Sequence, residues 1–278
     1  MGREVVFRNS GEDTKNDRIE ALITEIVKRL GEAQIAVLDP AKDGPKDDEE
    51  ELKAAQAASK EKVDLSEVPA CQSQPALPKN LQGLDDQAHA LDLWIGTWGR
   101  IPRWKRGVEI NFAAYSGGYP KLEDAVYAAR QLNCAALYWN SLEVGVTFKW
   151  VGRLADAEFV LGYGGDQGNT VARAFFPNAN DLNNLFVYKR AFDSDTKPAM
   201  WRFFLHELGH VLGLRHEFAR IEGGAVQWGN DDPLSVMNYR KEAAPMITEQ
   251  DIASTRAFYN YNEATINGVP VQLFVPDN

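Results

Sequence analysis

The chain has 278 residues, of which 44% are apolar, and it carries a formal net charge of −10 with a pI near 5.0. This length allows one large or two ordinary domains with a substantial core. The acidic balance argues against nucleic acid or an anionic membrane as the main partner, and no apolar run approaches the roughly 18 residues that a membrane span needs. Two cysteines, Cys71 and Cys134, cannot build a disulfide framework, and the first residues lack the apolar core of a secretory signal, which predicts an intracellular protein.

Residues 1–80 are predicted to be a helical and linker segment that leans on the rest of the chain, because so short a stretch builds little core of its own. The charged run at 42–51 is either a solvated linker or the acidic first turn of a helix. The predicted elements of this segment are an amphipathic helix over 17–30, a short strand over 34–38, a helix over 52–63 and an extended, proline-marked linker over 69–78.

Residues 81–278 are predicted to form the second and larger unit. A glycine-rich stretch at 162–168 has too many glycines for regular structure, and residues 193–198 are expected to cap a helix that carries three histidines. Strands are predicted over 107–112, 144–151, 158–161, 170–176 and 185–188, and further helices over 120–139 and 252–259, the last behind the capping signature of residues 248–251.

The histidine motif organises this second unit. His206 and His210 are spaced i, i+4, so both imidazoles lie on one face of a helix, and Gly213 permits the turn that brings in His216. Three neutral imidazoles leave one open position on a tetrahedral zinc ion, which is the arrangement of a catalytic site. Glu207 lies between the ligands, where its carboxylate can act as general base toward a water in that position. Three of the chain's four histidines fill this pattern, which argues against chance.

The helix around the motif has an apolar stripe, and the two histidines fall on the side opposite to it. The sequence therefore predicts that one face packs into the core while the other opens on a cleft. The stripe consists of Trp201, Phe204, Leu205, Leu208, Val211 and Leu212.

The motif from His206 to His216, followed by a turn at Met237, resembles the signature of the metzincin zinc peptidases. Tyr239, two residues after the methionine, resembles the tyrosine of astacins and serralysins, which is a further zinc ligand or stabilises the oxyanion. A ring packed beside the turn is the alternative. Glu217 resembles the astacin glutamate that tethers the processed N-terminus, with an ordinary ion pair as the alternative.

The resemblance implies an α+β, metzincin-like fold. Its parts are a twisted, mostly parallel sheet with an antiparallel edge strand, a long helix, an active-site helix, and a small C-terminal subdomain with a Met-turn and a terminal helix. It also implies a protein or peptide substrate that binds extended along the edge strand 170–176. The family is mostly secreted, so the resemblance and the N-terminal sequence point to different compartments.

The same resemblance raises questions about two further ligand positions. In matrixins a prosegment cysteine closes the zinc site, and Cys71 is a candidate for that role, although its surroundings lack the neighbouring arginine and glycine of that motif. An inert linker cysteine and a bond to Cys134 are the alternatives. Arg173 stands where matrixins have a histidine of a second, structural zinc, which argues against that ion, while a calcium held by Asp166 and loop carbonyls stays open.

The sequence thus predicts a zinc-dependent endopeptidase with His206, His210 and His216 as ligands, Glu207 as general base and Tyr239 as a further ligand or catalytic partner. The alternative is a catalytically silent, zinc-containing peptide-binding or effector protein whose N-terminal segment covers the cleft. The presence of a general base favours the enzyme, because binding alone has no use for one.

Overall fold

The computed structural model describes residues 6–7, 37–58, 65, 70–71, 92–96, 99–180, 182–216, 225–238 and 245–276. The predicted helix over 17–30, Glu217 and Tyr239 lie outside these described residues. Within them the protein is a mixed α/β structure with five α-helices and both parallel and antiparallel strand pairs, which agrees with the predicted α+β class.

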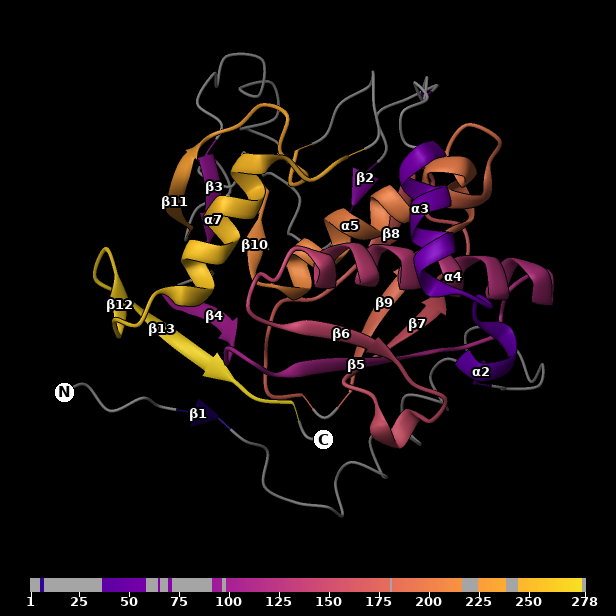
Figure 1. The fold of residues 1–278 in the computed structure, drawn as a ribbon, viewed down its shortest axis with the longest axis horizontal. Coiled ribbons are helices and arrows are strands. Elements are labelled where there is room, and N and C mark those ends of the chain that lie inside the picture. The colour runs from indigo at the N-terminus through magenta and orange to yellow at the C-terminus, as the bar shows by residue number, and fades with distance from the viewer. Residues whose placement is uncertain are drawn as a thin grey trace.

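The main sheet has six strands in the order β2-β8-β9-β7-β5-β6 (Figure 1). The pairs β5–β6, β5–β7 and β7–β9 are parallel, whereas β8 runs antiparallel to β9. Beyond β8, the short strand β2 adds in parallel. The strand bounds are β2 (Ala70–Cys71), β5 (Glu109–Ala114), β6 (Thr147–Trp150), β7 (Phe159–Tyr163), β8 (Thr170–Arg173) and β9 (Asn183–Val187).

The mostly parallel arrangement with one antiparallel pair, β8–β9, near the edge confirms that part of the prediction, with three corrections. The strand predicted over 170–176 ends at Arg173, a few residues before Pro177, which has no N–H to give a ladder. The glycine-rich stretch is not wholly irregular, because Gly162 and Tyr163 belong to β7. Strand β8 is also not the edge of the sheet in this structure, since β2 lies beyond it.

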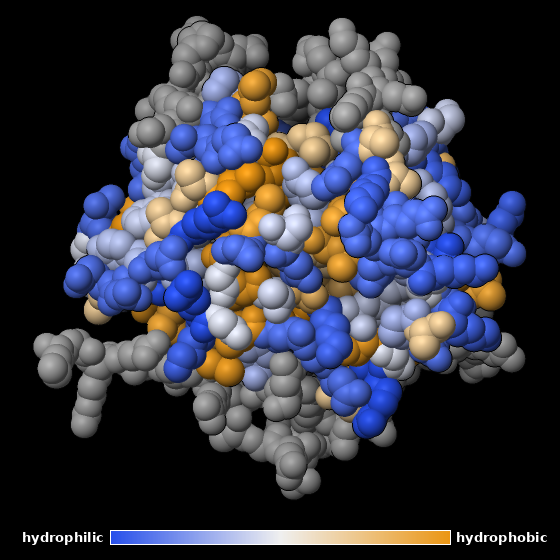
Figure 2. All heavy atoms as spheres, in the orientation of Figure 1, coloured by the Kyte–Doolittle hydropathy of each residue, from blue (hydrophilic) through white to orange (hydrophobic). Residues whose placement is uncertain are grey.

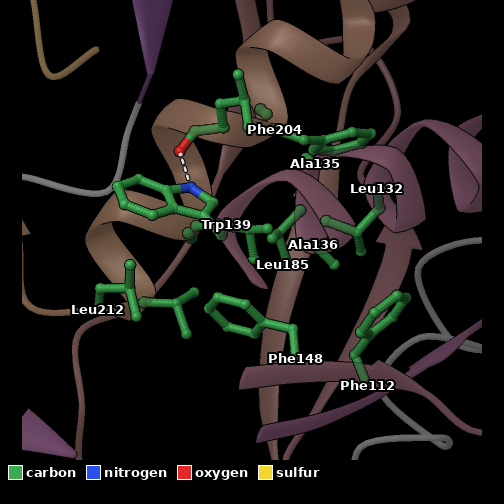
Figure 3. Packing of buried hydrophobic residues seen from close by; sticks show 14 of the residues in the cluster. Phe112, Leu132, Ala135, Ala136, Trp139, Phe148, Leu185, Phe204 and Leu212 are labelled. Carbon is green, nitrogen blue, oxygen red and sulfur yellow. Dashed lines mark hydrogen bonds between the residues drawn. The ribbon is translucent and has the colours of Figure 1, made fainter. Parts of the chain in front are cut away.

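Two long helices, α4 (Leu122–Ser141) and α5 (Met200–Val211), pack against each other, and α4 packs on β6. Figure 3 shows Trp139 of α4 between the side chains of α5 and those of the strands, with its indole N–H donating to Leu205 O at 3.0 Å. Because Trp139 is fully buried, this bond satisfies its one polar atom and fixes α5 against α4.

Where it is described, the N-terminal segment packs against the rest of the chain. Helix α3 (Asp48–Ala58) packs on α4, and Asn133 Nδ2 donates to Asp48 Oδ1 at 2.9 Å. Arg130 Nε of α4 donates to the carbonyl of Asp43, the last residue of helix α2 (Pro40–Asp43), at 2.8 Å. Leu38 and Leu65 are buried in the common core. Residues 48–51 of the charged run form the acidic first turn of α3, which confirms the second reading for that part of the run, whereas Lys42 and Asp43 belong to α2.

A smaller part of the fold surrounds the C-terminal helix α7 (Glu249–Asn260). Arg103 is buried here and donates to the carbonyls of Phe258 and Tyr261, which lie at the C-terminal end of α7. The bounds of its strands are β1 (Val6–Phe7), β3 (Asp92–Ile95), β4 (Ile101–Trp104), β10 (Leu214–Arg215), β11 (Val226–Asp231), β12 (Thr265–Ile266) and β13 (Val269–Phe274). Strands β10 and β11 both pair with β3, and β13 pairs with β1, β4 and β12.

Three 3₁₀ turns complete the described fold: η2 (Leu154–Asp156), η3 (Lys189–Phe192) and η4 (Lys197–Ala199). The face drawn in Figure 2 has hydrophilic margins around an apolar strip. Among the described large apolar residues only Leu122 and Leu234 are exposed, so most side chains of that kind are at least half covered. None of the helices in the described part of the chain combines the length and the apolar character needed to cross a membrane.

Candidate metal centre

Helix α5 carries the histidine motif and begins at Met200, directly after η4. The predicted cap over 193–198 is therefore only partly right. Ala199 occupies the N-cap position and offers no side-chain hydrogen bond. Asp193 instead holds the preceding turn, because its carbonyl accepts from Thr196 N at 3.2 Å and Lys197 N at 2.8 Å.

All twelve residues of α5 are buried, which corrects the prediction that one face opens on a cleft. His206, His210 and His216 are 1%, 0% and 3% exposed. A helix buried on every side is enclosed by other elements of the protein. Part of this cover comes from the N-terminal segment, because β2 brings Cys71 into contact with His210 and Glu207 on the face that carries the imidazoles.

The end of α5 is held so that the chain can turn back toward the site. Gly213 has φ +94, and its N–H donates to His210 O at 2.8 Å. A Cβ at this position would lie 2.6 Å from Pro102 O, so both the conformation and the space require glycine. Trp104 Nε1 and Tyr259 Oη donate to the carbonyls of Val211 and Leu212 at 2.7 and 2.9 Å. The turn predicted at Gly213 is present, and it delivers His216 to the other two imidazoles.

The three imidazoles converge through their Nε2 atoms. His210 Nε2 lies 3.1 Å from His206 Nε2 and 3.2 Å from His216 Nε2. His206 Nδ1 and His210 Nδ1 each contact a carbonyl oxygen, Val236 O at 2.8 Å and Leu214 O at 2.9 Å. Because a carbonyl only accepts, both Nδ1 atoms carry the proton, and in a neutral ring the Nε2 lone pair then points into the cluster.

Two lone pairs 3.1 Å apart repel each other unless a cation lies between them. Zinc–nitrogen bonds of about 2.0–2.1 Å in a tetrahedron give nitrogen–nitrogen separations of about 3.3 Å, close to those in the cluster.

Burial lowers the pKa of His206 to about 4, and it lowers the pKa of His210 and His216 well below their ordinary value. The rings are therefore neutral near pH 7, the form in which imidazole binds metals. The donor set fits a divalent cation that prefers nitrogen ligands.

Cys71 is the fourth member of the cluster. Its Sγ lies 3.5 Å from His210 Nε2, and all four ligand atoms lie within 4.8 Å of one another. In a tetrahedral site, a bond of about 2.3 Å from zinc to sulfur and one of about 2.0 Å from zinc to nitrogen give a sulfur–nitrogen separation of about 3.5 Å. Cys71 and Cys134 are both free thiols, and Cys134 is buried on α4, so the disulfide alternative is not formed.

Glu207 lies beside the cluster and is 1% exposed. The Cys71 thiol donates to Glu207 Oε2 across 3.6 Å. The carboxylate therefore faces the same position as the cysteine sulfur, which is where a fourth ligand of the metal would lie. This places a carboxylate, which can accept a proton, next to that position.

The turn that carries Met237 closes the other side of the site. Met237 is fully buried, and Gly209 of α5 comes so close to it that a Cβ there would lie 2.4 Å from Met237 Sδ. Ser235 and Val236, just before the methionine, bind the carboxylate of Asp251 at 2.6 and 2.8 Å. The capping signature at 248–251 predicted the helix start, but gave no sign that Asp251 also reaches this turn.

Replacing Gly209 with alanine tests this close approach. The new methyl group forces Met237 out of a filled space, and overpacking of this kind costs about 1–3 kcal/mol of unfolding free energy. Denaturant unfolding of Gly209→Ala, Met237→Ala and the double variant measures it. The cost of the alanine at 209 should largely vanish when Met237 is already truncated. Equal costs in both backgrounds would contradict the contact.

The calcium hypothesis gains no support from the geometry of its carboxylate. Asp166 accepts from Lys189 Nζ at 2.7 Å and from Gly168 N at 3.1 Å. A calcium ion bound by Asp166 would have to displace the lysine ammonium. The sequence predicts Tyr188 only as the end of a strand and gives no sign that it lies near the site. Burial raises the pKa of Tyr188, while the nearby guanidinium of Arg173 opposes that shift. Its ring fills the space beside Gly164.

Comparisons with known proteins leave the sequence and the geometry to carry the functional argument. No family model matches the chain, and a search of curated proteins found no match.

Proposed function

We propose that the chain is a zinc-dependent endopeptidase with His206, His210 and His216 as its metal ligands. The observation that carries the proposal is the convergence of three imidazole Nε2 atoms beside a buried carboxylate, that of Glu207. Metal-binding histidines alone would suit a structural site, whereas a general base beside the fourth position suits hydrolysis.

A zinc ion held by His206, His210 and His216 would supply Lewis acidity toward the scissile carbonyl and toward a water molecule. Glu207 is placed to accept a proton from the attacking water and to return it to the leaving amine. Tyr239 is proposed to stabilise the oxyanion or to complete the ligand set, as the resemblance to astacins and serralysins implies. The substrate is proposed to lie extended along β8, where main-chain hydrogen bonds align it over the metal.

The described conformation suits a latent form of such an enzyme. Cys71 Sγ takes the fourth ligand position, and β2 takes the free edge of β8. Strand β2 runs parallel to β8, opposite to the antiparallel direction proposed for a substrate. Activity then requires the segment around Cys71 to leave the site, which exposes the open metal position and the strand edge together.

The second candidate is a catalytically silent zinc protein. It is favoured by the same cysteine, because a closed set of one thiolate and three imidazoles is typical of structural zinc sites. In that case the N-terminal segment stays in place permanently. The two candidates differ in whether a protein without the Cys71 thiol hydrolyses peptides.

The test uses the full-length Cys71→Ser protein, loaded with zinc and incubated with a mixed peptide library. Cleavage products, identified by mass spectrometry, are expected with zinc and are expected to disappear with a chelator or with Glu207→Gln. Stoichiometric zinc without any chelator-sensitive cleavage would reject the peptidase and favour the silent protein.

A further inference from the structure

A continuous chain of hydrogen bonds links the buried carboxylate of Asp251 to the imidazole of His206. Asp251 Oδ1 accepts from Ser235 Oγ at 2.6 Å. Ser235 Oγ in turn accepts from Met237 N at 3.0 Å. The carbonyl of that same peptide unit, Val236 O, accepts from His206 Nδ1 at 2.8 Å. Three hydrogen bonds and one peptide group therefore connect the carboxylate to the ring.

Every donor in this chain points the same way, from the imidazole toward the carboxylate. Hydrogen bonds in such a series polarise one another, so the negative charge of Asp251 makes Val236 O a stronger acceptor. A stronger acceptor at Nδ1 fixes the tautomer with its lone pair on Nε2 and makes that nitrogen a better ligand.

Other contacts of Asp251 make the arrangement rigid. Its Oδ2 accepts from Val236 N at 2.8 Å and from Thr248 N at 2.9 Å, and Asp251 is 2% exposed. The first turn of α7 and the turn before Met237 are thereby held as one unit. The Nδ1 hydrogen bond of His210 differs from that of His206. It goes to Leu214 O in the short strand β10, and the described contacts of that carbonyl include no carboxylate.

We propose that Asp251 is a positioning residue for the metal centre, acting on His206 through Ser235 and the peptide group between Val236 and Met237. The proposal deepens the zinc peptidase proposed above and rests on it for the identity of the ligands. It assigns to the C-terminal helix a role in metal affinity as well as in folding.

The experiment measures the affinity of the full chain for Co²⁺ by competition with a chromophoric chelator, together with its thermal unfolding. Removal of outer-shell partners of metal ligands typically weakens metal binding by about 10- to 100-fold, and this loss is expected for Asp251→Ala and for Ser235→Ala. Asp251→Asn is expected to recover part of the loss, because an amide oxygen still accepts from Val236 N and Thr248 N.

The matched control is Thr255→Val on the same helix. Thr255 Oγ1 donates to the backbone carbonyl of Asp251 at 2.7 Å, so this variant loses a buried hydrogen bond without interrupting the chain to His206. It is expected to lower the unfolding temperature and to leave Co²⁺ affinity within about twofold of the parent chain.

Two results would overturn different parts of the account. If Asp251→Ala and Ser235→Ala unfold at lower temperature but bind Co²⁺ as tightly as the parent, Asp251 merely holds the fold and the positioning role is wrong. If the parent chain itself binds no Co²⁺ or Zn²⁺, the proposed function fails, and the role of Asp251 fails with it.

Discussion

Glu207→Gln is expected to lower kcat/KM for peptide hydrolysis by about 10²- to 10⁴-fold, the range that a positioned general base contributes. The comparison is made in the Cys71→Ser background, where the fourth metal position is open. Glutamine keeps the size of the side chain and removes its basicity. Because Glu207 is not one of the metal ligands, the zinc content should stay at one ion per chain.

The matched control for this variant is Glu249→Gln, the same chemical change at an exposed position on α7. Its hydrolysis rate should stay within about twofold of the background protein. Equal, chelator-sensitive rates for Glu207→Gln and Glu249→Gln would show that Glu207 is not the base, and that water at the metal is activated by another group.

Cys71→Ser is expected to raise the rate of peptide hydrolysis by about 100-fold, if the open form makes up about 1% of the parent protein. A hydroxyl is a much weaker zinc ligand than a thiolate, so the fourth position becomes available to water. Initial rates on a quenched-fluorescence peptide, with the parent chain alongside, measure the change. Cys134→Ser is the control, since Cys134 is buried on α4 and is not a member of the cluster formed by Cys71 and the three histidines.

Alkylation of the parent protein supplies an independent check on the same cysteine. With zinc bound, Cys71 should react with iodoacetamide slowly, and removal of zinc by a chelator should speed the reaction. Alkylation of Cys71 at the same rate with and without zinc, and without any gain in hydrolysis, would show that the thiolate does not close the site.

The sequence predicted those parts of the site that depend on local spacing. The separation of His206 and His210 by one helical turn, and the requirement for glycine at 213, follow from helix geometry, and the structure has both. The capping box of α7 was also predicted, because Thr248 and Asp251 are only three residues apart.

The parts that the sequence could not provide depend on contacts between distant residues. Cys71 meets Glu207 across 136 residues through β2, a strand of two residues that is too short to show any periodicity. This contact covers part of the histidine-bearing face of α5, which the amphipathic pattern alone predicted to be open. Asp251 reaches Ser235 across 16 residues in a geometry that only the folded turn defines.

Strands β4 and β13 were missed for a different reason. Each is short and contains a proline, Pro102 and Pro270, and a proline within a short run argues against a strand. They pair with each other in parallel, although they lie far apart in the sequence. Their pairing places Arg103 where it binds the carbonyls at the end of α7.

The most direct test of the central claim is X-ray absorption at the zinc edge of the zinc-loaded parent protein. If zinc is bound by three imidazoles and the Cys71 thiolate, the spectrum should show about three nitrogen atoms near 2.0–2.1 Å from zinc and one sulfur atom near 2.3 Å. The sulfur atom should be absent from the spectrum of Cys71→Ser. A parent spectrum without sulfur, or one left unchanged by Cys71→Ser, would contradict a metal centre that is closed by Cys71.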